Sequence, residues 1–190
     1  MTHFRQLADH ELQFLEEFVE VIDHRLDQIE RDVRLHHDPD SYGLLDTWES
    51  TSRIGFVLCQ NYVYDVLGRR DRRARQRCFD LGPMHPKGVS YAAIINAAGN
   101  FVKHHQEAEP LKRRHIDVLR QLGVLGHAYV DEGQRSVELD EPIDYPIGNL
   151  FHAMMAPAPN RFRHVIPLLE RWRDSVIETV EEPRPPLRRL

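Results

Sequence analysis

Five polar residues near the middle of the chain have side chains that could bind or react with a phosphate. They lie in the segment NAAGNFVKHHQEAEP, residues 96–110, and are Asn96, Asn100, Lys103, His104 and His105. Asn, Lys and His side chains can together hold a phosphate or a carboxylate and stabilise a developing negative charge. We therefore take this segment as the leading candidate for a functional face.

On an α-helix these residues separate into two sides, because each residue advances by about 100°. The polar side carries Asn96, Asn100, Lys103 and Glu107, with His104 beside them. His105 falls on the apolar side, so the two adjacent histidines are not expected to share a role. Two Asn residues with Gly99 between them cost helix propensity that Glu, Lys or Arg would not. The polar side is therefore interpreted either as a substrate-binding stripe or as a solvated face.

A second set of polar residues occurs in an expected helix over residues 44–67. Glu49 and Arg53 are four residues apart in the order that favours an ion pair, worth about 0.2–0.5 kcal/mol on a helix surface. One interpretation is an ordinary surface pair. In the other, Glu49 and Arg53 face the stripe of Asn96 and Asn100 across a groove and help to bind a substrate.

The segment RRDRRARQR, residues 69–77, contains six arginines and one acid. Arg binds phosphate through two parallel hydrogen bonds, so Arg69, Arg70, Arg72 and Arg73 are candidates for contact with RNA or DNA. A solvated face and a contact with an acidic partner protein remain alternatives. No aromatic residue interrupts the run to stack on bases, so the signal is electrostatic.

The sequence gives no sign of a metal centre or of a common nucleophile system. The segment HHDPD, residues 36–40, and the segment with His104 and His105 lack the i, i+4 spacing of a helical zinc pair, and neither contains Cys. The patterns GxSxG, GxxxxGK[ST] and HExxH do not occur. We therefore expect neither a metal nor a cofactor.

The segment NFVKHH, Asn100 to His105, resembles part of the active-site motif of the HEPN superfamily, in which an Arg and a short polar residue precede a His. Gly99 stands where the family places the Arg, and Lys103 would supply the positive charge. The resemblance implies a helical bundle that forms a homodimer, in a bacterial toxin–antitoxin or phage-defence system. It also implies metal-independent RNA cleavage, with Lys103 on the scissile phosphate, His104 as general acid or base, and Asn100 beside them.

Two other functions stay open at this point. The first is a non-catalytic interaction module, an antitoxin-like regulatory subunit in which the polar stripe contacts a cognate toxin or antitoxin. The second is a bundle that binds a nucleotide or small anion through Asn96, Asn100 and Lys103.

Apolar periodicity predicts the elements that must position these residues. Helices are expected over about 9–35, 44–67, 89–106, 110–122 and 162–180, and alternation around a Gly predicts a β-hairpin over 127–139. Asp9 and Ser90 are the expected N-caps of the first and third helices. The fold class is thus mainly α, an antiparallel bundle of about five helices with one small hairpin, forming one domain over 1–182 with a Pro- and Arg-rich tail at 183–190.

The amino-acid composition limits which kinds of protein this chain can be. The 190 residues are 41% apolar and carry a net charge of −5, which argues against non-specific coating of nucleic acid but leaves room for a local basic patch. Two cysteines fit a reducing cytoplasm better than secretion, and the N-terminal segment has no apolar signal-peptide core. We therefore expect a cytoplasmic protein that does not enter a membrane.

Overall fold

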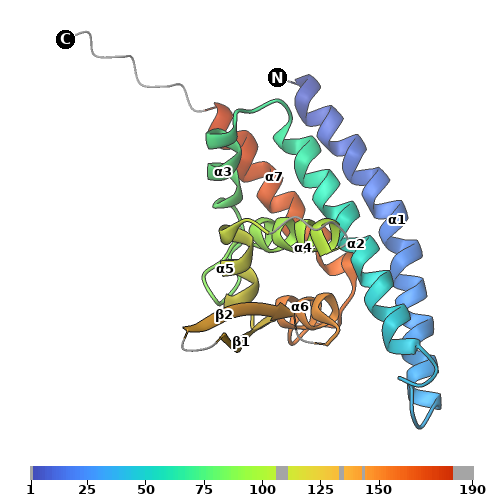
Figure 1. Cartoon of the computed structure of the whole chain (residues 1–190). Helices are drawn as coiled ribbons and strands as arrows, with labels where there is room; N and C mark the ends of the chain where they lie inside the picture. The colour runs from blue at the N-terminus through green and yellow to red at the C-terminus, as the bar shows by residue number, and fades with distance from the viewer. Residues whose placement is uncertain (1, 106–110, 133–134, 143, 182–190) are drawn as a thin grey trace.

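The structure, a computed structural model, describes the backbone of residues 2–105, 111–132, 135–142 and 144–181. Within these ranges it also describes the side chains, except those of 2–9, 105, 126–132, 135–142 and 180–181. The described part of the chain is mainly helical, with seven α-helices, one short 3-10 helix and two strands (Figure 1).

Two long helices form one side of the molecule. α1 (Thr2–Leu35) and α2 (Leu44–Leu67) run antiparallel and pack along their length (Figure 1). The predicted apolar seam of α1 is buried, from Leu12 to Ile29. α1 begins at Thr2, well before the start expected at Asp9, because residues 2–8 contain neither Pro nor Gly and continue the helix.

α4 (Tyr91–His105) lies across α2 and carries the polar residues of the candidate stripe (Figure 1). Ser90 caps it as predicted, because its Oγ accepts a hydrogen bond from the N–H of Ala93 at 3.0 Å. A side chain at Gly99 would collide with the side chain of Gln60 on α2. The glycine, which is costly for a helix, therefore permits the close crossing of α4 and α2.

The bundle has more helices than the five predicted. The arginine run folds as a separate helix, α3 (Arg72–Phe79), because the carboxylate of Asp71 accepts a hydrogen bond from the N–H of Ala74 at 2.9 Å and caps it. A further helix that was not predicted, α6 (Pro146–Met155), follows residue 143 and has Pro in its first turn. The fourth predicted helix is α5 (Arg113–Gln121), which packs on α4.

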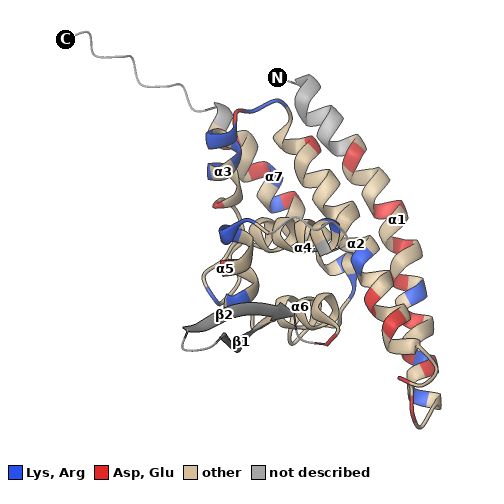
Figure 2. Cartoon of the chain, in the orientation of Figure 1, with Lys and Arg blue, Asp and Glu red and all other residues tan. Residues whose placement is uncertain are grey.

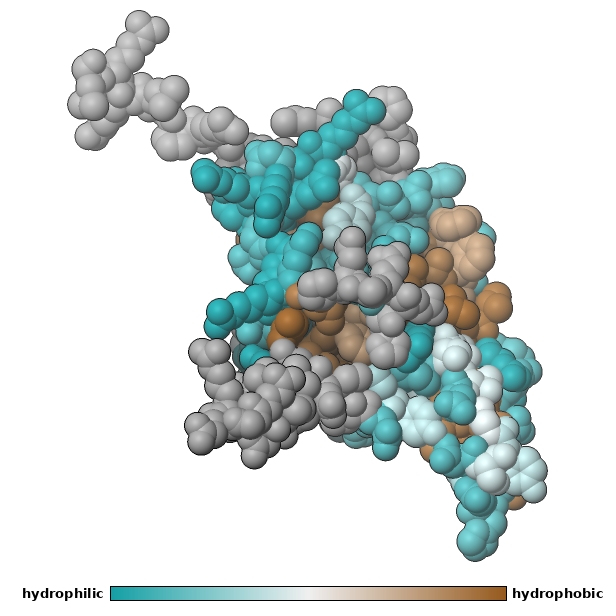
Figure 3. All heavy atoms as spheres, in the orientation of Figure 1, coloured by the Kyte–Doolittle hydropathy of each residue, from teal (hydrophilic) through white to brown (hydrophobic). Residues whose placement is uncertain are grey.

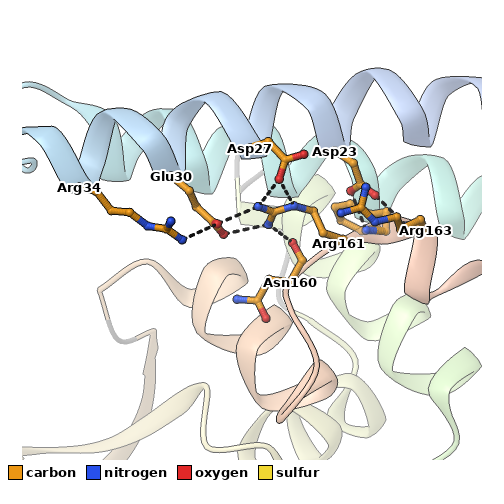
Figure 4. Close-up of polar contacts among 8 residues, drawn as sticks. Asp23, Asp27, Glu30, Arg34, Asn160, Arg161 and Arg163 are labelled. Carbon is orange, nitrogen blue, oxygen red and sulfur yellow. Dashed lines mark hydrogen bonds and ion pairs between the residues drawn. The ribbon is translucent and has the colours of Figure 1, made fainter.

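A short helix, η1 (Phe162–His164), leads into the last helix, α7 (Ile166–Glu181). An ionic cluster holds η1 against α1 (Figure 4). Asp23 accepts hydrogen bonds from the N–H groups of Phe162 at 2.7 Å and Arg163 at 3.0 Å. The buried guanidinium of Arg161 donates to Asp27 and Glu30, both at 2.8 Å. Segments more than 130 residues apart in the sequence are thus joined.

Between α5 and α6 the backbone runs as two antiparallel strands, β1 (Leu125–Glu132) and β2 (Arg135–Pro142), with Leu125 opposite Pro142. The side chains of 126–143 lie outside the described residues. The alternation of apolar and polar side chains on which the small hairpin was predicted therefore stays untested, and the helices define the architecture.

The helices share one continuous apolar core that contains residues of every α-helix. Trp172, Phe56, Phe151 and Phe162 are its largest fully buried side chains. Within the described ranges, no helix is both long enough and apolar enough to cross a membrane. The predicted tail, 183–190, lies outside the described residues.

Candidate functional site

A cationic cavity of about 290 Å³ lies where the end of α2, α3 and the start of α5 meet. We call it the basic pocket. Its lining carries five Lys or Arg side chains: Arg70, Arg72, Arg75, Lys112 and Arg114. Figure 2 shows these charges gathered over α3 and the beginning of α5, and Figure 3 shows the same face covered by hydrophilic residues over α3.

The C-terminal end of α2 holds two of these arginines in place. Arg70 donates from Nη1 to the carbonyl oxygens of Val66 at 2.8 Å and Leu67 at 2.6 Å. Arg75 donates from Nη2 to the carbonyl of Gly68 at 3.1 Å. Carbonyls at a helix C-terminus have no partner within the helix and carry partial negative charge, so they are good acceptors for guanidinium groups.

The described lining of the basic pocket contains no carboxylate. Asp71 is used as the cap of α3, and its hydrogen bond from Ala74 holds the pKa of its carboxyl below the usual range. Among the residues that the structure describes, no Asp or Glu lines the pocket and none pairs with Arg75 or Arg114. Like charges gathered in this way repel one another, and a bound anion such as phosphate would relieve the repulsion.

A buried polar network lies directly behind the basic pocket, on the side of α4. The Oδ1 atom of Asn96 accepts hydrogen bonds from Gln60 Nε2 at 3.2 Å, Tyr64 Oη at 3.0 Å and Asn100 Nδ2 at 3.0 Å. Asn96 is only 3% exposed. It therefore does not belong to a solvent-facing stripe, because α2 and α5 cover this side of α4.

His115 on α5 connects the network to the basic pocket. Its Nε2 accepts hydrogen bonds from Arg114 Nε at 3.1 Å and from Asn96 Nδ2 at 3.3 Å, which assigns the ring proton to Nδ1. Burial, reinforced by the charges of Arg114, Lys112 and His104, lowers the pKa of His115 to about 4. The ring is therefore neutral near pH 7, and its buried Nδ1–H has no hydrogen-bond partner among the described residues.

The predicted catalytic residues lie at the end of α4, and the structure connects them to this network to different degrees. Asn100 is half-buried and bonded to Asn96, whereas Lys103 is exposed. His104 is half-buried and close enough to His115 to affect its pKa. The side chain of His105 and all of Glu107 lie outside the described residues.

The predicted phosphate-binding arginines divide into two groups. Arg70 and Arg72 line the basic pocket. Arg69 and Arg73 are exposed and lie outside its lining, although they are the sequence neighbours of Arg70 and Arg72. The structure thus brings the arginine run and the Asn96 network together around one site, which the sequence presented as separate features.

Glu49 and Arg53 serve a different part of the fold. The Glu49 carboxylate is 5% exposed and accepts hydrogen bonds from the N–H groups of Ile147 at 3.1 Å and Gly148 at 2.6 Å, at the start of α6. Arg53 Nε donates to the same carboxylate at 3.1 Å. On α2 it is Gln60 and Tyr64, rather than Glu49 or Arg53, that contact the polar residues of α4.

The sequence interpretation missed Lys112, Arg114 and His115. They lie in the segment LKRRH, residues 111–115, which was interpreted only as the beginning of a helix. One signal was present: His115 shares a helical face with Leu119 and Leu122, four and seven residues later, and both are buried. A His in that position is expected to be buried as well.

A larger cavity lies elsewhere, as a groove of about 870 Å³ between α1 and the start of α7. It has several acidic residues, but Asp23 and Asp27 already hold η1 and Arg161 there (Figure 4). The described residues contain no group of three or more His, Cys, Asp or Glu side chains placed to hold a metal ion. The basic pocket is therefore the better candidate for a functional site.

Comparison of the chain with models of known protein families, with curated proteins and with solved structures gave no match. The function of this chain must therefore be inferred from the chemistry of the basic pocket and of the polar network behind it.

Proposed function

We propose that this protein binds RNA and that the basic pocket holds a backbone phosphate. The supporting observation is the cluster of five cationic side chains, without a neighbouring carboxylate in the described lining, on a chain whose net charge is −5. Positive charge that is concentrated against the overall charge of a protein creates a local field for an anionic ligand. Exposed Arg69, Arg73 and Arg77 continue the cationic surface beyond the pocket, which favours a polyanion over a small anion.

Metal-independent cleavage of that RNA is the sharper form of the proposal, in line with the HEPN resemblance. His104 would exchange a proton with the 2′-hydroxyl or the leaving oxygen, Lys103 would hold the scissile phosphate, and Asn100 would be oriented by its bond to Asn96. The supporting observations are that Asn100 belongs to the buried polar network and that His104 follows it one helical turn later on α4. The homodimer and the toxin or antitoxin partner implied by the resemblance stay predictions.

Binding is tested by fluorescence anisotropy with a labelled single-stranded RNA at several salt concentrations. The variant Arg72→Ala/Lys112→Ala removes two exposed charges of the pocket. The slope of log affinity against log salt should become shallower by about 1.4, because each lost phosphate contact removes about 0.7 for a single strand. The control Arg25→Ala/Arg34→Ala changes the charge equally on exposed positions of α1 and should keep the slope. Equal slopes for the two variants would refute the proposal.

Cleavage is tested separately, by incubating RNA with the purified protein in EDTA beside the His104→Ala variant. Loss of cleavage in a folded His104→Ala protein would support the nuclease. Binding without cleavage, on several RNAs, would discard the nuclease and retain an RNA-binding protein. If the protein neither binds nor cleaves RNA, the result would favour the non-catalytic interaction module.

A further inference from the structure

A second cavity, of about 310 Å³, adjoins the basic pocket. The two cavities share three lining residues, Gln76, Phe79 and Arg114. Arg114 donates a hydrogen bond from Nη1 to Gln76 Oε1, so this pair joins α5 to α3 where the cavities meet. A ligand that extends past the Arg114–Gln76 pair would therefore occupy both cavities at once.

The second cavity has a different chemical character from the basic pocket. Part of its lining is apolar, contributed by Phe79, Met84, Val89, Ala93 and Val118. Two carboxylates, Asp80 and Asp117, also line it. A phosphate would be repelled by these acids, whereas a flat neutral group with hydrogen-bond donors could pack on the apolar wall and donate to them.

One residue of this lining also has a buried polar atom without a partner. His115 lines the second cavity and is 3% exposed, and its Nδ1–H finds no acceptor among the described residues. A buried donor without a partner is costly, and a ligand oxygen or ring nitrogen could accept its hydrogen bond. The lining thus combines an apolar wall with two carboxylate acceptors and a residue that has a buried donor without a partner.

We infer that the second cavity binds the nucleobase of a nucleotide whose phosphate lies in the basic pocket. This inference rests on the proposed RNA-binding function and extends it from the phosphate to the base. Together the two cavities have a volume within the usual range for small-molecule sites. Adenine, cytosine and guanine carry an amino group that can donate to Asp80 or Asp117. Uracil presents carbonyl oxygens on both sides of its single N–H, and the carboxylates repel them.

Isothermal titration calorimetry with four simple ligands tests the arrangement on the whole protein. The ligands are inorganic phosphate, cytidine, cytidine monophosphate and uridine monophosphate. Cytidine monophosphate should bind at least about tenfold more tightly than phosphate or cytidine alone, because only it fills both cavities. It should also bind more tightly than uridine monophosphate. Equal affinities for phosphate and both nucleotides would overturn the inference.

A cavity-filling variant tests the second cavity itself. Val118 lines only the second cavity, so Val118→Phe should reduce the affinity for cytidine monophosphate to that for phosphate and leave phosphate binding unchanged. The control Ile116→Phe makes the same kind of change on α5 outside both linings, and circular dichroism verifies that both variants fold. If Val118→Phe binds cytidine monophosphate as tightly as the wild type does, the inferred nucleobase site is refuted, while the proposed binding of RNA through the basic pocket is not affected. If the wild type binds neither phosphate nor RNA, the proposed function itself fails.

Discussion

Replacing Glu49 by Gln should destabilise the fold without affecting RNA binding. The buried Glu49 carboxylate accepts hydrogen bonds from two N–H groups at the start of α6 and one from Arg53. Gln keeps the shape of the side chain but exchanges one acceptor oxygen for a donor nitrogen. That nitrogen would face an N–H group of Ile147 or Gly148, and the negative charge near the N-terminus of α6 would be lost.

The cost can be worked from these contacts. A hydrogen bond to a charged group contributes about 1.5–3 kcal/mol, and at least one of the two backbone bonds is lost while the other becomes a neutral one. We therefore expect Glu49→Gln to lower the free energy of unfolding by about 2–4 kcal/mol. Urea unfolding followed by circular dichroism measures it. Glu17 on α1 is exposed, so Glu17→Gln makes the same chemical change at the surface and, as the matched control, should change stability by less than about 0.5 kcal/mol.

Two results would contradict this account of Glu49. An unfolding midpoint equal to that of the Glu17→Gln control would show that the carboxylate does not hold α6. Loss of RNA binding by a folded Glu49→Gln protein would instead return Glu49 to the substrate-binding role considered from the sequence.

Three further predictions concern other contacts of the structure. The pKa of His115 is about 4 in the folded protein against an ordinary value of 6.5, so the unfolded chain takes up a proton first as the pH falls. The free energy of unfolding should therefore decrease by about 2–3 kcal/mol from pH 7 to pH 4. His115→Gln should remove this part of the pH dependence. Gly55→Ala should lower the free energy of unfolding in urea by about 1–3 kcal/mol, because its methyl group would collide with the Phe162 ring. The double variant Gly55→Ala/Phe162→Leu should lower it by less than the sum of the two single changes, and strict additivity would exclude the collision. Asp71→Asn keeps a good cap but removes a negative charge beside the arginines, so RNA affinity measured by anisotropy should rise about two- to fivefold at unchanged stability, whereas an unchanged affinity would place the RNA elsewhere.

The helical architecture could be predicted because apolar periodicity is a local signal. The positions of α2 and α4 were predicted to within a few residues, as was the Ser90 cap, since both depend on residues close in the sequence. The cap of α3 was missed because Asp71 was considered only as an isolated charge within the arginine run.

The site was less predictable because its parts come from distant segments. The polar residues of α4 were noticed, but no local pattern reveals that Gln60 and His115 cover Asn96 from two other helices. The same limit applies to Glu49, whose partners lie nearly 100 residues later in the chain. Arg70 and Arg72 were singled out by charge alone, whereas Arg114 becomes part of the site only when α5 folds back beside α3.

The hydrogen bonds of Asn96 also bear on how α4 finds its place along α2. A helix whose contact surface is built only from Ala, Ile and Phe could slide by one turn and still bury similar apolar area. Such a slip would move Asn96 away from Gln60, leaving the fully buried amide of Gln60 without its partners, and would drive a side chain into the space that Gly99 leaves open. The amide and the glycine therefore penalise a slip by one turn, and the alignment that survives is the one in which Asn96 on α4 reaches His115 on α5.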